Sequence, residues 1–496
     1  MGAASRRGAL PSLIDNALER ADGALGGALE ATFVAKHRRR MARHGWADAV
    51  PRSSPGAGEW ERVWAPRRPV RDGNKIDVLI DGAEALPQIQ ADIESARSHV
   101  HIAGWHPSPG FLLTPQGPPL RDLLASTAQR VPVRVLMWGG PPLPLFTPTR
   151  PQVRRDREEF LRGGAVECEI DIRERTMHCH HEKLVVVDDR VAYVGGIDLT
   201  ALAGNRYDEP GHPHADRLGW HDVATRIEGA AVGDVAWHLV NRWRDVTGRD
   251  VPDPVTPGPA GDVALQIVRT VPENLYNFLL GGEFTILAAY VRALRAAERL
   301  IYLENQFLWS PEVVEILIDK LTNPPADDFR LLLVLPRHPN NGRDTTCGQL
   351  ARLVAADEGR GRLLATTLIG PTAASPGVYV HAKVGIVDDR WLTVGSANLN
   401  EHSLYNDTEM NVVAQDPELA RRTRLRLWSE HLHMPEAEID GPPSEVVDSL
   451  WRAQCDVEDP ISAAHLDPVH RIRRLSGLSH RLDRLRGPLS GLVVDG

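Results

Sequence analysis

Two stretches of the chain carry a histidine, a lysine and an aspartate at the same spacing, H-x-K-x-x-x-x-D. The six residues are His181, Lys183 and Asp188 in the first stretch and His381, Lys383 and Asp388 in the second. Residues two apart in a strand project from the same face, so each histidine points the same way as its lysine. An ammonium charge beside an imidazole suits an anionic phosphate, because the imidazole can attack phosphorus or move a proton.

The two stretches are parts of a longer internal repeat. Residues 181–200 align without a gap to residues 381–400, and nine of these twenty positions are identical. Only five of the 57 basic residues are lysines, and two of those five occupy this one repeated position. The motif is expected by chance roughly 0.01 times in a chain of this composition, so a matched pair indicates a duplicated functional site.

Two such strands facing each other would place two imidazoles and two ammonium groups around one phosphorus atom. One imidazole could then attack in line while the other protonates the leaving oxygen. Asp188 and Asp388 complete the two motifs, and each opens a D-D-R turn. We expect these two carboxylates first of all to fix the hairpins.

Two other interpretations of these residues remain to be weighed. Buried strands with incidental polar side chains would not repeat a histidine and a lysine in register with their flanks. A metal cluster of His178, His180 and His181 is the second interpretation. The second repeat offers only His381 at the matching positions, and no cysteine or carboxylate partner recurs there. The sequence therefore predicts a site without a metal ion.

The elements that would position these residues occur twice in the same order. In the first half the expected strands, helices and hairpin lie at 77–81, 84–98, 99–105, 132–139, 183–196 and 232–248. In the second half they lie at 264–270, 283–299, 300–309, 312–321, 329–336, 383–396 and 419–432. Alternating strands and helices, given twice, predict two α/β units related by duplication.

Stretches rich in proline and glycine divide the chain into segments. Residues 10–43 show a helical pattern with a basic end. The expected segments are an N-terminal helical and basic extension with an irregular arm at 1–72, a first α/β domain at 73–250, a linker at 251–261, a second α/β domain at 262–436, and a tail packed on the core at 437–496.

The composition excludes several classes of protein. The 496 residues are 42% hydrophobic and 25% charged with a formal net charge of -9, which fits a globular protein and not one that coats nucleic acid. Four cysteines without zinc-ligand spacing predict no disulfide framework. No apolar run reaches the ~18 residues of a membrane span, and no signal-peptide pattern opens the chain. We expect a monomeric cytoplasmic protein that can attach peripherally to a membrane.

These residues resemble the motifs of the phospholipase D superfamily. Each H-x-K motif is followed by a glycine and a polar residue, in GGID at 195–198 and in GSAN at 395–398. The stretches IYLENQFLW, WHDV and NDTEMNVV resemble segments of eukaryotic-type phospholipases D. The likeness runs from about Val78 to the end of the chain. It implies an α/β fold of two tandem phospholipase D repeats, each a mixed sheet flanked by helices, related by a pseudo-two-fold axis.

The resemblance implies a role for each site residue. His181 would attack phosphorus to form a phosphohistidine, and His381 would protonate the leaving alcohol and later activate water or an acceptor alcohol. The two motif lysines would bind the non-bridging oxygens, helped by Asn398 and Ser396. Neither a metal nor another cofactor is implied, because the ammonium groups supply the stabilising charge.

The resemblance also implies a carboxylate partner for each motif histidine, downstream in the same repeat. Asp222 would pair with His181, and Glu409 would pair with His381. Each carboxylate would accept a hydrogen bond from Nδ1, which keeps the lone pair on Nε2 and stabilises the imidazolium. Many members of the family have Asn at the position of Asp198. An ionised Asp198 cannot donate a hydrogen bond to phosphate, so a direct phosphate contact is not expected there.

The implied function is a phospholipase D-type phosphodiesterase that removes the head group of a glycerophospholipid at a membrane surface. Its acceptor would be water or an alcohol. A cardiolipin synthase-like phosphatidyltransferase would use the same site, but such enzymes commonly carry N-terminal membrane spans. The negative net charge disfavours a superfamily nuclease with a nucleic-acid partner. The six intact motif residues disfavour a lipid-binding scaffold with a dead site.

Overall fold

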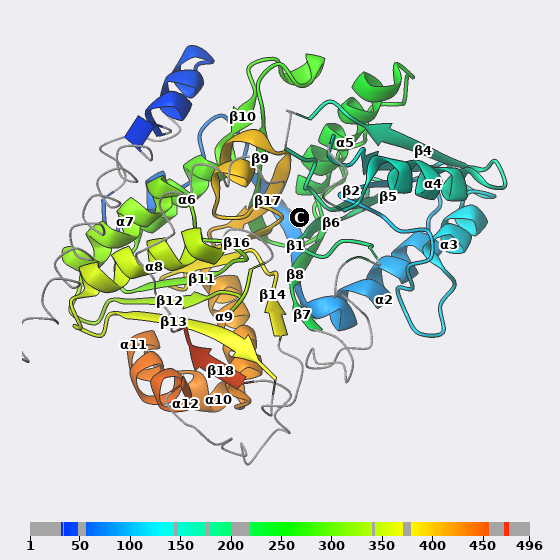
Figure 1. The fold of residues 1–496 in the computed structure, drawn as a ribbon. Coiled ribbons are helices and arrows are strands. Elements are labelled where there is room, and N and C mark those ends of the chain that lie inside the picture. The colour runs from blue at the N-terminus through cyan, green and yellow to red at the C-terminus, as the bar shows by residue number, and fades with distance from the viewer. Residues whose placement is uncertain are drawn as a thin grey trace, which may run out of the picture.

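One mixed β-sheet runs through both halves of the chain in this computed structural model (Figure 1). The structure describes residues 31–32, 34–47, 56–142, 147–174, 178–200, 202, 219–339, 343–370, 378–455 and 471–475. Of the helix expected at 10–43, residues 34–43 are helical and the first twenty-one lie outside the described residues. Much of the expected C-terminal tail also lies outside them.

The strands of the large sheet follow a regular order. From one edge to the other they are β18 (Arg471–Arg474), β13 (Leu363–Ile369), β12 (Arg330–Val334), β11 (Leu300–Glu304), β15 (Val384–Val387), β16 (Trp391–Gly395), β17 (Glu409–Ala414), β9 (Val263–Val271), β1 (Arg71–Ile80), β8 (Val223–Glu228), β6 (Val191–Gly195), β5 (Leu184–Val187), β2 (Val100–Gly104), β3 (Val133–Trp138) and β4 (Val166–Asp171), with β10 (Glu283–Phe284) beside β9. A separate two-stranded sheet pairs β7 (Gly219–His221) with β14 (Val378–Val380).

The two halves of the sheet have equivalent strand orders on either side of the central β9–β1 pair. On one side follow β17, β16, β15, β11, β12 and β13, and on the other β8, β6, β5, β2, β3 and β4. In both halves the outer three of these strands are parallel and the inner ones antiparallel. The expected α/β class with a mixed sheet is therefore confirmed. The matching order is what a duplication predicts, and the two-fold axis stays a prediction.

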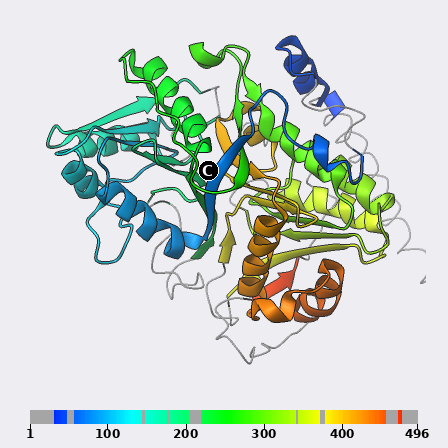
Figure 2. The same ribbon diagram turned by 180° about the vertical axis from the view of Figure 1, so that it is seen from behind.

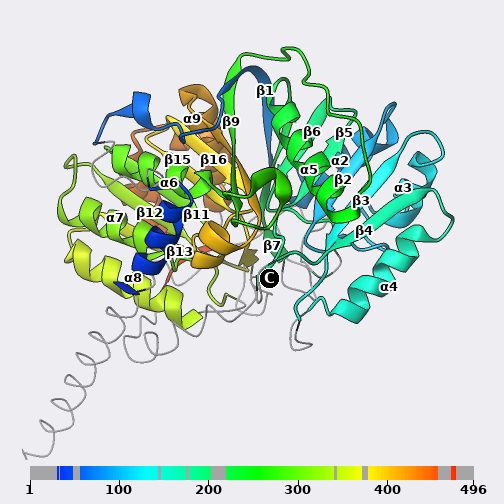
Figure 3. The same cartoon turned by 90° about the horizontal axis from the view of Figure 1, so that it is seen from above.

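Helices cover both faces of each half of the sheet (Figure 3). In the first half they are α2 (Asp81–Glu94), α3 (Leu120–Thr127) and α4 (Arg150–Leu161) on one face and α5 (Ala231–Thr247) on the other. In the second half they are α6 (Thr285–Ala296), α7 (Pro311–Thr322) and α8 (Arg343–Asp357) on one face and α9 (Pro417–Leu432) on the other. The short helices α10 (Glu436–Ile439), α11 (Pro443–Val446), η4 (Val447–Trp451) and α12 (Arg452–Cys455) follow α9 (Figure 2).

Local sequence signals explain where several of these helices begin. Ser310 and Asp416 cap α7 and α9, because their side chains accept hydrogen bonds from the N–H groups of Val313 and Leu419. A proline follows each cap at the first helical position, where its missing N–H costs nothing. Within the described ranges, no helix is long and apolar enough to cross a membrane.

Asp188 and Asp388 each end the strand that carries their motif. Both residues adopt a left-handed conformation, with φ of 59° and 53°, which aspartate tolerates better than most residues. The Asp188 carboxylate accepts the backbone N–H groups of residues 97–99 at 2.6–3.1 Å. The Asp388 carboxylate accepts those of residues 298–300 at 2.7–2.8 Å. Both carboxylates therefore fix the hairpin to the start of the neighbouring strand.

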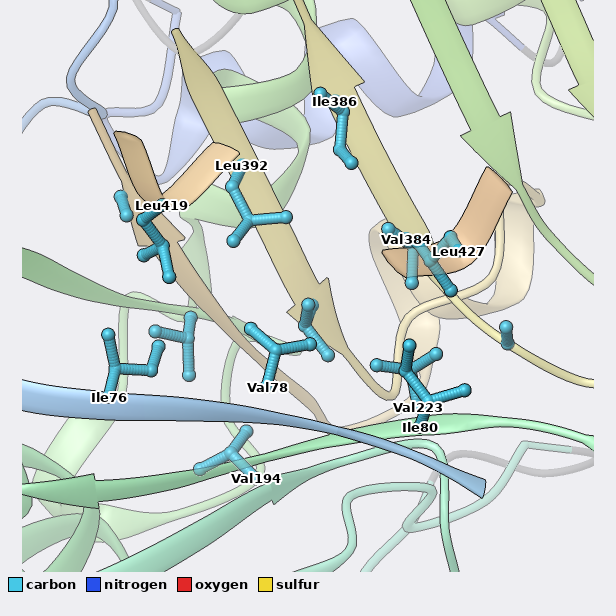
Figure 4. Close-up of a cluster of buried hydrophobic side chains, with 14 of the residues drawn as sticks. Ile76, Val78, Ile80, Val194, Val223, Val384, Ile386, Leu392, Leu419 and Leu427 are labelled. Atoms are coloured by element: carbon cyan, nitrogen blue, oxygen red, sulfur yellow. The ribbon is translucent and has the colours of Figure 1, made fainter. Parts of the chain in front are cut away.

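The hydrophobic core between α5 and α9 is shared by the two halves. It joins buried side chains of β1, β5, β6 and β8 to those of β15, β16 and β17. Figure 4 shows Ile76, Val78 and Ile80 of β1 facing Leu392 of β16 and Val384 of β15. Because one apolar cluster crosses the boundary, neither half can bury its inner face alone.

We therefore expect the two halves to unfold together. Leu392→Ala should destabilise the protein by about 2–5 kcal/mol, because Leu392 is 2% exposed and its truncation leaves a cavity. Hydrogen exchange should accelerate in β5 of the first half as much as in β15. The control Ile172→Ala, at a side chain 62% exposed, should change stability by at most about 0.5 kcal/mol. Faster exchange confined to the second half would contradict a shared core.

Candidate active site

The two motif histidines are anchored by backbone hydrogen bonds to the opposite half of the chain. The N–H groups of His181 and Glu182 donate to the carbonyl of Thr408 at 2.9 and 3.1 Å. The N–H groups of His381 and its neighbour donate to the carbonyl of His221 at 2.8 and 3.0 Å. The same register continues upstream, where β14 pairs in parallel with β7 and His180 forms a parallel bridge with Thr408.

Each motif histidine meets a carboxylate of the other half. Nδ1 of His181 lies 3.0 Å from Oε1 of Glu409, and Nδ1 of His381 lies 2.6 Å from Oδ2 of Asp222. All four side chains are buried. The residues expected as partners are the right ones, but the expectation that each pair forms within one repeat is wrong.

The crossed pairing follows from the backbone contacts. Asp222 comes directly after His221, the residue whose carbonyl binds the second motif, and Glu409 comes directly after Thr408, which binds the first. In both cases the carboxylate next to the acceptor carbonyl contacts the histidine bound there. Both histidines therefore depend on the contact between the halves, and neither half forms a complete His–carboxylate pair alone.

The two lysines directly precede the strands β5 and β15, which begin at Leu184 and Val384. Nζ of Lys183 donates to the carbonyl of His181 at 2.6 Å and lies 3.8 Å from Oδ2 of Asp198. Nζ of Lys383 donates to the carbonyl of His381 and, at 3.4 Å, to Oε1 of Gln306. Each ammonium group is thus fixed on the backbone carbonyl of its own histidine.

The residues expected to bind phosphate differ in their placement. Asn398 donates to Oε1 of Gln306 at 3.3 Å, so it lies next to Lys383. The hydroxyl of Ser396 instead donates to Oε2 of Glu409 and accepts the N–H of Met410 at 3.1 Å. Ser396 therefore orients the carboxylate that binds His181.

Asp198 and the two motif aspartates are occupied by backbone groups. Oδ2 of Asp198 accepts the N–H of Trp105 at 3.1 Å, and Oδ1 accepts its own neighbour's N–H at 2.9 Å. Asp188 and Asp388 follow the four-residue strands β5 and β15, about 20 Å of extended chain beyond the histidines. Their hydrogen bonds to the backbone N–H groups of residues 97–99 and 298–300 support a positioning role rather than contact with a substrate.

The electrostatic environment differs between the two histidines. Burial, and next the charge of Lys383, lower the pKa of His381 to about 3, against the opposing effect of Asp222. Lys183 of the other motif contributes to this lowering, so charges of both motifs act at one place. Burial raises the pKa of Asp222, but His381, Lys383 and a backbone N–H have the larger opposite effect. The pKa of Asp222 is therefore lowered. His381 is therefore a neutral imidazole that donates from Nδ1 to an ionised Asp222.

A second, buried hydrogen-bond network surrounds His221, whose carbonyl accepts the N–H of His381. Glu304 accepts from Nε2 of His221 at 2.7 Å and from Nε2 of His431 at 3.0 Å. The Nδ1 atom of His221 lies 3.2 Å from Oδ1 of Asp81. Burial works against a charge on His221, but Glu304 and Asp81 raise its pKa well above the usual range. A charged His221 thus fixes the carbonyl that holds His381.

Two residues of this network lie in stretches that carry the family resemblance, although neither was expected in the site. Glu304 and Gln306 belong to the IYLENQFLW stretch, whose strand ends at Glu304 and not at residue 309 as expected. The chain leaves the sheet there because Asn305 accepts the N–H groups of Phe307 and Leu399 at 3.1 and 3.0 Å. His221 lies in the WHDV stretch beside Asp222.

The three histidines considered as a metal cluster point to three different sets of partners. His181 binds Glu409, His180 lies 3.1 Å from Oδ1 of Asp171, and Nδ1 of His178 lies 2.9 Å from Nδ1 of His402. A site built from His178, His180 and His181 together is therefore wrong.

Comparisons with known proteins agree on one family. A family model described as "Cardiolipin synthase, PLD-like domain" matches residues 290–429. Phospholipase D A of Dictyostelium discoideum is 24% identical, over 77% of this chain and 37% of that protein. Phospholipase D alpha 1 of Cynara cardunculus is 26% identical, over 63% of this chain and 57% of that protein. The chain thus spans less than two thirds of the length of these two relatives.

A solved structure extends the likeness over most of the fold. Phosphatidylserine synthase of Haemophilus influenzae aligns with a TM-score of 0.52 at 13% identity, over 79% of this chain and 96% of that chain. The chain is thus similar in sequence and in fold to members of the phospholipase D superfamily. The α/β fold with a mixed sheet is the one that the sequence resemblance implied.

Gly196 makes room for the carboxylate that binds His381. A Cβ atom on Gly196 would lie 2.0 Å from Oδ1 of Asp222. Gly196→Ala should therefore displace Asp222, weaken its hydrogen bond to His381 and cost about 1–3 kcal/mol in stability. The Nδ1–H resonance of His381 in NMR spectra should shift or disappear, as it should in Asp222→Asn. The control Gly110→Ala, with no atom within 4 Å of its new Cβ, should leave the resonance in place.

The protonation state of His381 gives a second test. Its lowered pKa means that the folded protein resists protonation, whereas the unfolded chain binds a proton near pH 6.5. The stabilising contribution of neutral His381 is thus complete above about pH 6.5 and is lost as the pH falls toward 3. In NMR titrations of 15N-histidine-labelled protein, the His381 ring should keep neutral shifts down to about pH 5. Titration of this ring above pH 5 would refute the assignment.

Proposed function

We propose that this protein is a phospholipase D-type phosphodiesterase acting on glycerophospholipids. The observation that carries the proposal is the interlocked pair of His–carboxylate contacts, His181–Glu409 and His381–Asp222, each beside a buried lysine. Two imidazoles with fixed tautomers and two ammonium groups match the needs of an in-line displacement at phosphorus. The names of the relatives supply the substrate class.

The proposed first step forms a covalent intermediate. Nε2 of His181 attacks phosphorus, the bond to the head-group oxygen breaks, and that oxygen leaves with its electron pair and a proton from His381. The two motif lysines balance the charge on the non-bridging oxygens throughout. The product of this step is a phosphatidyl group on His181 and a neutral head-group alcohol.

The second step frees His181 and returns His381 to its protonated form, which loses its proton to solvent when the product leaves. His381, now neutral, takes a proton from water or an acceptor alcohol, whose oxygen attacks phosphorus. The P–N bond breaks and its electron pair returns to Nε2 of His181. The hydrogen bond from Nδ1 to Glu409 keeps that lone pair on Nε2.

The lowered pKa of His381 makes substrate binding part of the mechanism. An imidazole that is neutral in the resting protein cannot donate a proton to a leaving group. A phosphodiester anion between the lysines adds negative charge beside the ring and raises its pKa, which favours proton uptake on binding. We propose that the acid form of His381 arises in this way, and that water activation uses the neutral form.

A phosphatidyltransferase of the cardiolipin synthase type is the second candidate. The family model that matches residues 290–429 carries that description. The same two steps give this reaction when the acceptor is the hydroxyl of a lipid instead of water. A phospholipid at a membrane surface, a monomeric protein and the absence of a nucleic-acid partner complete the proposal, in keeping with the net charge of -9.

The roles of the two histidines can be separated by the leaving group. His381→Ala should lower turnover of a natural phospholipid by about 10²–10⁴-fold, the usual contribution of a general acid. With a p-nitrophenyl phosphodiester, whose leaving group needs no proton, it should still release one equivalent in a burst. His181→Ala should show no burst, and His44→Ala, outside the site, should behave as wild type. A burst in His181→Ala but not in His381→Ala would reverse the two roles.

The acceptor decides between the two candidate reactions. Purified protein is incubated with mixed phospholipid vesicles, with and without ethanol, and the products are identified by mass spectrometry. A phosphodiesterase with an accessible intermediate should give phosphatidic acid and, with ethanol, phosphatidylethanol. Formation of a diphosphatidyl product from phosphatidylglycerol, with little phosphatidic acid, would decide for the synthase. Neither product, with the fold intact, would reject both.

A further inference from the structure

A second group of ligand-type side chains lies next to the first motif. It consists of His178, three residues before His181, together with His402 and Asp407 from the opposite half of the chain. One ligand atom from each residue lies within 4.8 Å of the other two. Nδ1 of His178 is 2.9 Å from Nδ1 of His402 and 3.3 Å from Oδ1 of Asp407. None of the steps proposed above uses these three side chains.

The separations are close to those of ligands around one zinc ion. Zinc binds imidazole nitrogen at ~2.0–2.1 Å and carboxylate oxygen at ~2.0–2.2 Å, so ligands of a tetrahedral ion lie about 3.3–3.4 Å apart. The two measured separations of 2.9 and 3.3 Å approach this value. Two imidazoles and one carboxylate are also a common ligand set for zinc and related divalent ions.

The buried carboxylate gives an independent observation. The side chain of Asp407 is fully buried, and its Oδ1 accepts the N–H of Cys179 at 2.9 Å. Among the described residues, the other oxygen of Asp407, Oδ2, is buried without a hydrogen-bond partner. A buried carboxylate oxygen without a partner is costly, and coordination of a cation would remove that cost.

The two imidazole nitrogens, Nδ1 of His178 and Nδ1 of His402, face each other. Nitrogens 2.9 Å apart can share one proton, in which case one donates and the other accepts. Oδ1 of Asp407 is a further acceptor 3.3 Å from the same His178 nitrogen. Nδ1 of His178 thus lies close to a ligand atom of each of the other two residues, and a divalent cation among the three would replace the shared proton.

From this geometry we infer that His178, His402 and Asp407 bind one divalent transition-metal ion, of which zinc fits best. The ion would join two segments 224 residues apart in the sequence. Thr408 and Glu409, which bind His181, directly follow Asp407. The ion would therefore act as a structural cross-link that keeps the first motif against its carboxylate, and it is not a participant in the chemistry.

One other group of three ligand-type side chains lies in the described part of the chain, and its contacts disfavour a metal ion. His221, Glu430 and His431 also bring ligand atoms within 4.8 Å of one another. Both ring nitrogens of His221 already face carboxylates, Glu304 at 2.7 Å and Asp81 at 3.2 Å. A doubly protonated ring offers no lone pair to a metal, so we expect one bound ion per chain rather than two.

Metal binding can be measured without any enzyme assay, so the test is independent of the proposed function. Untagged protein is stripped with a chelator, passed through a desalting column and titrated with Zn²⁺ in competition with a chromophoric chelator. Bound zinc is counted by mass spectrometry of the metal. We expect about one ion per chain, and a rise in Tm on zinc addition because the ion binds only the folded state.

The variants identify the ligands. Two variants each remove one ligand: His178→Ala, at a partly exposed position, and Asp407→Asn, which keeps the side-chain shape. Each should lower the zinc affinity by at least about 10–100-fold, because changes to residues that only contact a metal ligand already cause a loss of that size. Both should lose the rise in Tm, and His44→Ala should keep it. Circular dichroism checks that each variant is folded. Wild-type protein with less than about 0.1 ion per chain, or unchanged affinity in both folded variants, would overturn the inference.

Discussion

The structure depends on one exchange of backbone hydrogen bonds between the two halves of the chain. The carbonyl of Thr408 receives the N–H groups that begin the first motif, and the carbonyl of His221 receives those that begin the second. Because a carboxylate follows each of these carbonyls, the same exchange gives each histidine its partner. The apolar core between α5 and α9 stabilises this contact, since its side chains come from both halves. Site and fold are thus held by one interface.

This arrangement brings many charged groups into a buried place, and each is balanced locally. Asp222 accepts from a neutral His381, and Glu304 and Asp81 surround a charged His221. Burial raises the pKa of Glu409, while His181 and Lys183 act in the opposite direction. A buried charge without a partner would cost several kcal/mol, so the pattern of pairs restricts which side chain can occupy each position. Sterically, position 196 is restricted to glycine, because a Cβ atom there would collide with Asp222.

Much of the fold was predictable from the sequence, for local reasons. The hairpins at 183–196 and 383–396 have buried strands that read as apolar runs, and a D-D-R turn that adopts positive φ values. The helices α7 and α9 begin at capping residues that are visible in the sequence. The repeat gave the correspondence between the halves. The end of the strand at Glu304 was missed, because it depends on the contact of Asn305 with the N–H of Leu399, 94 residues away.

The sequence by itself determined which residue types do the chemistry, because a duplicated H-x-K motif is a local pattern. It also named Asp222 and Glu409 as the carboxylates, through the family resemblance. Only the tertiary structure decided which carboxylate binds which histidine. The family resemblance implied pairing within one repeat, although the separations of 41 residues from His181 to Asp222 and 28 from His381 to Glu409 force no local contact. The partner is set instead by which strand edges meet, and edges meet where backbone groups of the two halves need hydrogen bonds and their apolar faces need burial.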